Sequence, residues 1–332
     1  MVAAMSTMLA AQYDASGPPE VLRVRTVTRP TPTPNHVLVR VAASSINGAD
    51  TMVRSGRAKL VSGHSFPRGT GFDLAGEVAD VGAGVKSIRA GDAVWGFYRN
   101  AMKGPLGSAA EFALVPAKGI ALHPKTVDAL EGAALSGAGG AALIALRDAV
   151  SIRRGERVLI RGAGGGVGTA AVQIARTLGG RVTALVRTGH IEKVCAIGAE
   201  EAFDYRAVDP RSLGRFDVIL DTVGKNMRAH RPLLSRKGRM AALMIGGVGD
   251  AAYVSVSAIF GSRRVRFVEA PPTAAVLRDL SELVDAGKLK PVIDSIHPLN
   301  EIVEAHRAME AGGTFGKRVV RIDVATRSSE KL

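Results

Sequence analysis

The middle of the chain alternates between short apolar runs and stretches in which apolar residues recur at helical spacing. Val158 to Ile160 form one such run, and from Val167 onward apolar residues return every three or four positions. The expected elements are strand 157–161, helix 167–179, strand 182–186, helix 190–197, strand 216–221, helix 226–234 and strand 239–245. Strands that alternate with helices in this way predict a doubly wound parallel sheet.

The first 120 residues follow a different pattern, in which short β-type runs are separated by Pro and Gly. The expected strands are 37–41, 74–81, 93–97 and 111–115. They predict a mostly antiparallel β unit. After a strand at 265–268 and a helical segment that ends near residue 286, a last β-type run covers 316–322 and is expected to return to the first unit. The predicted divisions are residues 8–130, 131–270 and 271–332.

A glycine-rich turn joins strand 157–161 to helix 167–179. Five glycines lie within the seven residues 162–168, and no side chain there is larger than valine. Glycine lets the backbone approach a ligand closely, and the first amides of a helix attract anions. The spacing Gly162-x-x-Gly165-x-x-Gly168 departs from the strict G-x-G-x-x-G, and a flexible loop is the alternative. Because a strand precedes the glycines and a helix follows them, the turn predicts a site for a dinucleotide pyrophosphate.

Composition limits the class of protein. With 332 residues, of which 46% are hydrophobic, the chain is long enough for two domains with a large core. Residues 1–7 carry no basic segment followed by a long apolar one, which argues against a secretion signal. The apolar stretches are broken by Gly or charge, which argues against a membrane span.

The single cysteine, Cys195, excludes a disulfide within the chain and fits a reducing cytoplasm. Its helical context predicts a small core residue. The formal net charge is +14, and aromatic residues make up only 4% of the chain. Few aromatics and no recognised nucleic-acid motif argue against a specific nucleic-acid partner, although weak binding to polyanions at low salt stays open. The basic residues are spread along the sequence, for example Arg23, Arg25, Arg153, Arg154, Arg236, Lys237, Arg263, Arg264 and Arg266.

Taken together, the chain resembles the medium-chain dehydrogenase/reductase superfamily, and within it the zinc-independent quinone oxidoreductase group that includes zeta-crystallin. The resemblance runs from Met8 to Ile322, so residues 1–7 are expected to be a disordered leader. It rests on Gly155-Glu156-x-x-Leu159-x-x-x-Ala163-Gly164-Gly165-Gly166-x-Gly168-x4-Gln173-x-x-Arg176, on Ser45-Ile46-Asn47-x-x-Asp50-x-x-x-Arg54-x-Gly56 and on Gly71-x-Asp73-x-Ala75-Gly76-x-Val78. It implies a GroES-like, mostly β catalytic domain beside a Rossmann domain, with the active site in the cleft between them, and a homodimer.

The same resemblance argues against catalytic zinc. The zinc-dependent branch carries Cys where this chain has Asn47, and Gly-His-Glu where it has Gly71-Phe72-Asp73. Zinc needs three or four Cys, His or carboxylate ligands, and residues 97–108 contain no Cys for the second, structural zinc site. No metal is therefore expected.

The end of strand 182–186 indicates which nicotinamide dinucleotide is bound. A site for NAD places Asp or Glu there for the ribose 2′-hydroxyl, whereas the 2′-phosphate of NADP requires a cation. Here Arg187, Thr188 and His190 follow the strand, and the guanidinium of Arg187 is suited to a phosphate. NADPH is therefore expected in preference to NADH. By resemblance, Tyr205 lies near the adenosine, although a half-buried structural tyrosine is the alternative.

The remaining site residues follow from the resemblance and from the chemistry of hydride transfer. The expected cofactor contacts are Ala163, Gly164, Gly165, Gly166, Val167, Gly168, Arg187, Thr188, His190, Tyr205, Val223 and Lys317. Asn47 is the expected donor to the substrate oxygen, which becomes negative as hydride arrives, and Asp50 is expected to orient it. The alternative is that Asn47 only caps a helical turn, with Asp50 as its local partner. Met52, Trp95 and Phe97 are expected to line an apolar substrate pocket.

The expected function is NADPH-dependent reduction of a quinone or an α,β-unsaturated carbonyl. Two alternatives stay open: an enoyl thioester reductase, and a cofactor-binding protein with little catalysis. The second is favoured by Met52, where relatives carry a tyrosine, and by Ala141, where they carry a threonine.

Overall fold

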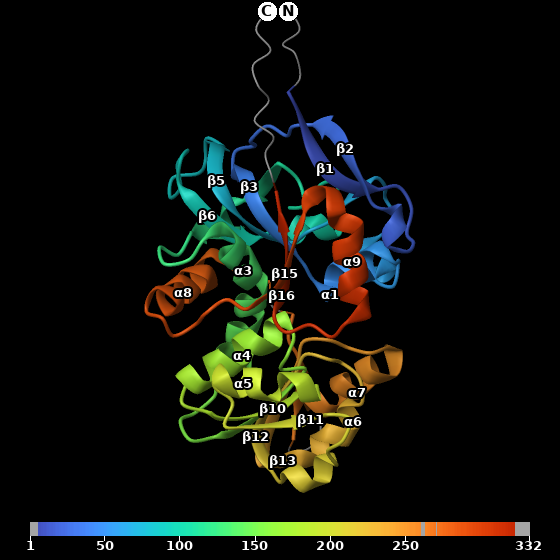
Figure 1. Cartoon of the computed structure of the whole chain (residues 1–332), viewed down its shortest axis with the longest axis vertical. Helices are drawn as coiled ribbons and strands as arrows, with labels where there is room; N and C mark the ends of the chain where they lie inside the picture. Colours follow the sequence, from blue (N-terminus) through green and yellow to red (C-terminus); the bar gives the residue numbers. More distant parts are fainter. Residues whose placement is uncertain (1–5, 260–262, 270, 323–332) are drawn as a thin grey trace, which may run out of the picture.

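The computed structural model describes residues 6–259, 263–269 and 271–322. Two domains are stacked along the long axis of the molecule (Figure 1), a β-rich domain at one end and a parallel sheet flanked by helices at the other. The predicted fold class, a Rossmann domain plus a GroES-like domain, is confirmed.

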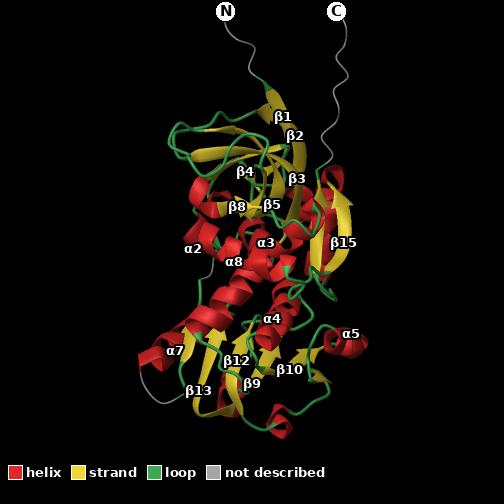
Figure 2. Cartoon of the chain, turned by 90° about the vertical axis from the view of Figure 1, so that its left-hand side faces the viewer, coloured by secondary structure: helices red, strands yellow, loops and turns green. Residues whose placement is uncertain are grey.

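The Rossmann sheet has six strands in the order β11-β10-β9-β12-β13-β14, and every neighbouring pair is parallel. The strands are β9 (Arg157–Arg161), β10 (Arg181–Val186), β11 (Glu201–Asp204), β12 (Phe216–Asp221), β13 (Leu234–Ala242) and β14 (Val265–Phe267). Val158, Leu159 and Ile160 have no exposed surface, as expected for a strand with helices on both faces. The carboxyl ends of the strands point toward the β-rich domain (Figure 2).

The β-rich domain contains two sheets. One has the order β15-β16-β3-β5-β6-β8 with β7 paired to β3, and the other has the order β2-β1-β4. The strands are β1 (Thr7–Tyr13), β2 (Arg23–Thr28), β3 (His36–Ile46), β4 (Arg68–Gly69), β5 (Asp73–Val81), β6 (Ala93–Phe97), β7 (Phe112–Pro116), β8 (Ile120–Leu122), β15 (Ile293–Pro298) and β16 (Lys317–Arg321). Because β16 pairs with β3, the last strand returns to the first unit.

Several helices link or cover these sheets. They are α1 (Gly48–Arg54), α2 (Lys59–Ser62), α3 (Ala129–Leu143), α4 (Gly166–Thr177), α5 (Ile191–Ala196), α6 (Met227–His230), α7 (Val248–Ile259), α8 (Ala274–Asp285) and α9 (Ile302–Ala311). Helix α3 contacts α4 as well as β3, β5 and β16, so it packs between the two domains.

The expectation that every apolar stretch is broken short of a membrane span is wrong for the helical segment that begins with α3. With the turn that follows it, the helix runs from Ala129 to Ala149, and these 21 residues are long and apolar enough to span a membrane. In the structure, 72% of its most apolar 18-residue stretch is buried inside the protein. A helix that is apolar on all sides is also what the core of a large protein requires, and α3 lies in such a core.

Two further expectations are corrected. Cys195 was expected in the core but is exposed on α5. Its neighbour Val194, which has no exposed surface, is the residue that packs against the domain. Residues 1–7 were expected to be disordered, but Thr7 is the first residue of β1 and pairs with Thr28. Residues 1–5 lie outside the described part of the chain.

Candidate functional site

The glycine turn lies where the strand order of the Rossmann sheet reverses. The chain leaves β9 at Gly162 and leaves the neighbouring strand β12 at Thr222, so both carboxyl ends open at the same point. A Cβ atom on Gly162 would come within 2.9 Å of Val223 Cγ2, and Val223 is 44% exposed. Dinucleotides bind in the crevice at such a reversal of strand order.

The backbone of the turn requires glycine at two positions. Gly162 has a φ of +72°, in the left-handed region. A Cβ on Gly168 would lie 2.2 Å from the carbonyl oxygen of Gly162. The first hydrogen bond of α4 runs from the Thr169 amide to the Gly165 oxygen, so the amides of residues 166–168 have no acceptor within the helix and can meet a phosphate. This cradle fits a dinucleotide pyrophosphate.

Ala163 contributes to this cradle by packing. Its side chain has no exposed surface, and its amide donates to the Leu185 oxygen at 3.2 Å. Val167 is half-buried and packs on the core of the domain. The amides of residues 166–168 are thus the groups that remain for a ligand.

Cations gather where β10 ends. The half-buried Arg187 hydrogen-bonds the hydroxyl of Tyr205, which is 48% exposed and lies under the guanidinium of Arg206. Burial raises the pKa of Tyr205, but the hydrogen bonds from Arg206 and Arg187 outweigh it and the pKa is lowered. His190 has a lowered pKa because of burial and the nearby Lys193 and Arg187.

The Thr188 hydroxyl, expected to contact the cofactor, already has an acceptor. It donates to Asp204 at the end of β11, and the Thr188 amide donates to the same carboxylate at 3.2 Å. This carboxylate was not expected near Thr188, because Asp204 lies at the end of the next strand along the chain. Of the three residues after β10, Arg187 is therefore the one best placed to meet a phosphate.

A segment of the catalytic domain lies directly on the glycine turn. The Gly316 amide donates to the Gly164 oxygen at 2.9 Å, and the Phe315 ring packs against His190 with centroids 5.3 Å apart. The side chain of Lys317 then crosses the start of α4, where a Cβ on Gly166 would meet its Cδ at 2.8 Å. The two domains therefore meet at the cradle itself.

Lys317 leads from the cradle into a buried polar cluster. Its Nζ donates to Asn47 Oδ1 at 2.5 Å and to Asp73 Oδ2 at 2.9 Å, and Asn47 Nδ2 donates to the same Asp73 oxygen at 2.8 Å. The side chains of Lys317 and Asp73 are 6% and 0% exposed. The cluster thus joins three segments, at the end of β3, the start of β5 and the start of β16.

Asp73 is the centre of this cluster. Its Oδ2 also accepts from the Ser45 hydroxyl at 2.5 Å, while Oδ1 accepts from the Ser136 hydroxyl at 3.0 Å and the Gly137 amide at 2.7 Å. Burial raises the pKa of the Asp73 carboxyl, but Lys317 and the hydrogen bonds from Ser45 and Asn47 outweigh it and hold the pKa below its usual value. The carboxylate is therefore ionised and fixes the Lys317 ammonium and the Asn47 amide in place.

Asp50 has a different role from the one expected. Its Oδ2 accepts from the backbone amide of Asn47 at 2.8 Å, as in a capping box at the start of α1, and Oδ1 accepts from the Gly71 amide at 2.7 Å. Burial raises its pKa to about 6. The expectation that Asp50 orients the Asn47 side chain is wrong, because Asp73 holds that amide while Asp50 positions the backbone.

The expected substrate pocket is corrected at one residue. Trp95 has no exposed surface and packs edge-on against His123, so it belongs to the core. Phe97 is half-buried and stacks on Phe72 with centroids 5.5 Å apart. A Cβ on Gly137 would meet the Phe97 ring at 2.8 Å, which places that ring beside the Asp73 cluster. Met52, on α1, is also half-buried.

Asp73 and Ser45 belong to the motifs that carry the family resemblance, but no role at the site was expected for Asp73 or for its partners Ser45 and Ser136. The signal was present in Gly71-x-Asp73-x-Ala75-Gly76, where a lone acid stands next to a buried strand. Within the described residues no three His, Cys, Asp or Glu side chains are grouped so as to hold a metal ion.

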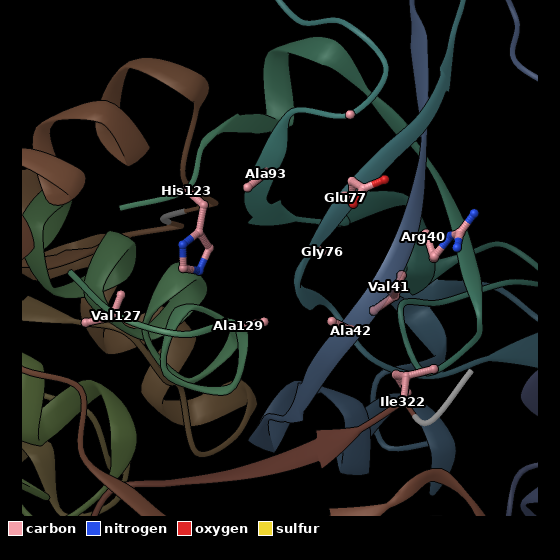
Figure 3. A pocket seen from close by; sticks show the side chains of 11 residues that line it. Arg40, Val41, Ala42, Gly76, Glu77, Ala93, His123, Val127, Ala129 and Ile322 are labelled. Atoms are coloured by element: carbon pink, nitrogen blue, oxygen red, sulfur yellow. The ribbon is translucent and has the colours of Figure 1, made fainter. Parts of the chain in front are cut away.

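A hollow of about 390 Å³ on the catalytic domain is separate from this site (Figure 3). It is lined by Arg40, Val41, Ala42, Gly76, Glu77, Gly91, Ala93, His123, Val127, Ala129 and Ile322. None of the expected site residues lines it.

Comparison with known proteins agrees with this architecture. Residues 33–125 match the alcohol dehydrogenase GroES-like domain, and residues 197–320 match a family described as zinc-binding dehydrogenase. The 2-methylene-furan-3-one reductase of Solanum lycopersicum is 32% identical over 324 residues, which cover 95% of this chain and 79% of that protein.

Solved structures give the same result. The quinone oxidoreductase of Coxiella burnetii superposes with a TM-score of 0.86 at 29% identity, covering 95% of this chain and 99% of that one. The quinone oxidoreductase of Escherichia coli, solved in complex with NADPH, gives a TM-score of 0.80 at 26% identity and covers 94% and 99% of the two chains. The chain belongs to the quinone oxidoreductase group of the medium-chain dehydrogenase/reductase superfamily.

Proposed function

We propose that this protein is an NADPH-dependent, zinc-independent reductase of quinones or α,β-unsaturated carbonyl compounds. The observation that carries the proposal is Lys317, whose side chain runs from the glycine cradle into the Asn47–Asp73 cluster. One residue thereby connects the site for a dinucleotide with a set of fixed hydrogen-bond donors.

The cradle residues would hold the cofactor by its phosphates. The amides of residues 166–168 face the pyrophosphate position at the start of α4, and Val223 borders the crevice from the neighbouring strand. When bound, the nicotinamide supplies the hydride, and the protein contributes orientation and electrostatics.

The polar cluster would stabilise the negative charge that develops on a substrate oxygen. An ammonium has three N–H groups and an amide two; Lys317 uses two of its groups and Asn47 uses one. The remaining N–H of each has no acceptor among the described residues. Asp73 fixes both donors before substrate arrives, so little reorganisation is needed during the reaction.

The choice of NADPH rests on the charge at the end of β10. Arg187 and Arg206 both lie beside Tyr205, whereas the carboxylate of Asp204 is already engaged by Thr188. A 2′-phosphate would gain a charge-assisted hydrogen bond from Arg187 that a 2′-hydroxyl would not.

We predict that Arg187→Ala raises the KM for NADPH by roughly tenfold, which corresponds to the loss of one such bond. The KM for NADH should change by less than about twofold. Steady-state kinetics with both nucleotides measure the two values. Arg211→Ala, an exposed arginine elsewhere in the Rossmann domain, serves as the charge control. An equal rise for NADH and NADPH would refute the assignment of Arg187 to the 2′-phosphate.

The substrate class is tested by NADPH oxidation against simple quinones, alkenals and crotonyl-CoA. We expect turnover of a quinone or an alkenal. Turnover of crotonyl-CoA alone would indicate an enoyl thioester reductase. Tight NADPH binding without turnover of any acceptor would indicate a cofactor-binding protein, the alternative that Met52 and Ala141 suggest.

We also propose that the protein works in the cytoplasm as a homodimer. The exposed thiol of Cys195 fits a reducing compartment. The homodimer rests on family membership, and sedimentation velocity tests it.

A further inference from the structure

A second charged region lies where the Rossmann strands begin, at the end of the sheet opposite the glycine cradle. We call this end the amino edge of the sheet and the end with the cradle its carboxyl edge. It is a hollow of about 490 Å³, formed where the chain enters β9, β13 and β14. We call it the basic hollow. Its lining residues are Ala149, Val150, Ser151, Arg153, Arg236, Lys237, Gly238, Arg239, Arg263, Arg264 and Arg266. Seven of these eleven residues are cationic and none is acidic.

The hollow gathers residues that are far apart in the sequence. Six of the nine basic residues named above as spread along the sequence line this hollow, so folding brings them together in space. They come from the segment before β9, from β13, from the segment leading into β14 and from β14 itself.

An irregularity in β13 places two of these cations. Leu234 pairs with Phe216, and the next pair is Arg239 with Val218, so five steps along β13 face two steps along β12. Residues 235–238 therefore bulge out of the ladder and carry Arg236 and Lys237, both exposed, to the edge of the sheet.

Two of the cations have a structural role. Arg239 donates to the Ser151 oxygen at 2.6 Å and forms an ion pair with Glu156 at 2.8 Å. Arg266 donates to the Ala149 oxygen at 3.1 Å, at the end of the helical segment that follows α3. Such contacts stabilise the carboxyl end of a helix.

The other five cations have no such explanation. Within residues 6–259, 263–269 and 271–322, no carboxylate forms an ion pair with Arg236, Lys237, Arg263 or Arg264. Arg153 forms no ion pair with a described carboxylate either, and the nearby Glu156 carboxylate that attracts it is already paired with Arg239. Like charges held this close repel one another, and a concave wall of one sign concentrates the field inside it. A multiply charged anion would remove the repulsion.

The shape and lining of the hollow indicate the kind of anion. None of its described lining residues is aromatic, so among them a nucleic-acid base finds no platform for stacking. The described lining residues include no large exposed apolar side chain that could enter a lipid bilayer. A volume of about 490 Å³ is in the range of pockets for small ligands. A compact anion with several phosphate groups fits these features better than a long duplex or a membrane.

We propose that the basic hollow is a binding site for a compact polyphosphate, separate from the cofactor crevice. The unpaired guanidinium and ammonium groups of Arg153, Arg236, Lys237, Arg263 and Arg264 would bind its phosphate oxygens. The site lies at the amino edge of the parallel sheet, so it leaves the cradle at the carboxyl edge free for the dinucleotide.

The test uses inorganic tripolyphosphate as the probe, in isothermal titration calorimetry of the full chain at 0.15 M salt. The variant is Arg236→Gln/Lys237→Gln/Arg264→Gln, which removes three exposed charges of the hollow. The matched control, Lys86→Gln/Lys103→Gln/Lys288→Gln, removes three exposed charges from three separate loops. Both variants have the same net charge, and circular dichroism checks that both fold.

We expect the wild-type protein and the control to bind tripolyphosphate within about twofold of each other, and the hollow variant to bind it roughly tenfold more weakly. NADPH oxidation by the hollow variant should stay within about twofold of the wild type. No binding by the wild type at this salt concentration, or an equal loss in both variants, would overturn the proposal. So would binding of a 20-base-pair duplex that depends on the hollow when tripolyphosphate does not bind, because the occupant would then be nucleic acid.

Discussion

The carboxyl and amino edges of the Rossmann sheet differ in whether their charged side chains are buried and paired or exposed and unpaired. At the carboxyl edge two ion pairs are buried: Arg161 pairs with Asp221 at 2.6 Å with side chains 8% and 0% exposed, and Lys317 of the adjoining catalytic domain pairs with Asp73. Arg187, at the same edge, is half-buried and lies at the expected cofactor site. At the amino edge, Arg236, Lys237 and Arg264 are exposed, and no described carboxylate pairs with them. The difference follows from solvation, because a buried charge is very costly without a partner, whereas water screens an exposed one.

This contrast predicts how each edge responds to mutation. At the carboxyl edge, removal of one partner leaves the other buried and uncompensated, so the effects should be large and local. At the amino edge, each cation contributes little alone, and the effects should be small, additive and dependent on salt.

The largest effect is expected for Lys317→Met. Asp73 would keep its hydrogen bonds but lose its counter-charge inside the protein, which should lower the free energy of unfolding at pH 7 by about 3 kcal/mol. Loss of a fixed donor should lower kcat by roughly 100-fold. Chemical denaturation and NADPH oxidation measure the two effects. In the double variant Lys317→Met/Asp73→Asn, stability should largely return while activity does not.

The pH dependence distinguishes a lost charge pair from lost packing. In the wild type the pKa of Asp73 lies below its usual value of about 3.8, so the pair contributes stability above about pH 4 that is lost as the pH falls. In Lys317→Met, burial raises the pKa instead, and the folded state takes up a proton more readily than the unfolded chain. The variant should therefore gain more stability than the wild type as the pH falls from 8 to 5, because the gain from Asp50, whose pKa is about 6, is common to both proteins. A flat profile over that range would contradict the role given to the pair.

A smaller effect is expected within the glycine turn. The Cβ of Gly168→Ala would lie 2.2 Å from the Gly162 oxygen and 2.6 Å from Ala163 Cα, both backbone atoms that cannot move aside alone. Overpacking of this kind should cost about 2 kcal/mol and weaken NADPH binding, as measured by thermal unfolding and fluorescence titration. The control is Gly165→Ala in the same turn, where the nearest atom is 3.6 Å away and φ is −78°. Similar unfolding temperatures for the two variants would show that close backbone packing is not the reason why position 168 requires glycine.

The two edges also differ in how far the sequence predicts them. The cradle could be predicted because strand, turn and helix are contiguous, and β9 and α4 lie within a residue or two of the expected positions. The Asp73 cluster could not, because Lys317 and Asp73 are 244 residues apart and meet only when β16 returns to β3. The basic hollow depends on a bulge in β13, which an apolar pattern does not reveal.

Errors at single residues have a related cause. The apolar pattern predicted the strand of Trp95 and the helix of Cys195 but not which way each side chain points. Trp95 was expected in the substrate pocket and lies in the core, whereas Cys195 was expected in the core and lies on the surface. Asp50 and Asp73 are both buried acids near Asn47, and only the structure shows that one holds its backbone and the other its side chain.

The smallest effect is expected at the amino edge, and it has the opposite sign. Arg236→Gln/Lys237→Gln/Arg264→Gln should raise the free energy of unfolding by about 0.5–1 kcal/mol at 10 mM salt, because it relieves repulsion between exposed cations. The gain should vanish near 0.5 M salt, since the screening length falls from roughly 30 Å to below 8 Å over that range. The control Lys86→Gln/Lys103→Gln/Lys288→Gln has the same net charge, so it should gain less if repulsion is concentrated in the hollow. Equal gains in urea denaturation would mean that net charge rather than the hollow governs the effect, and the contrast between the two edges would then rest on the buried pairs alone.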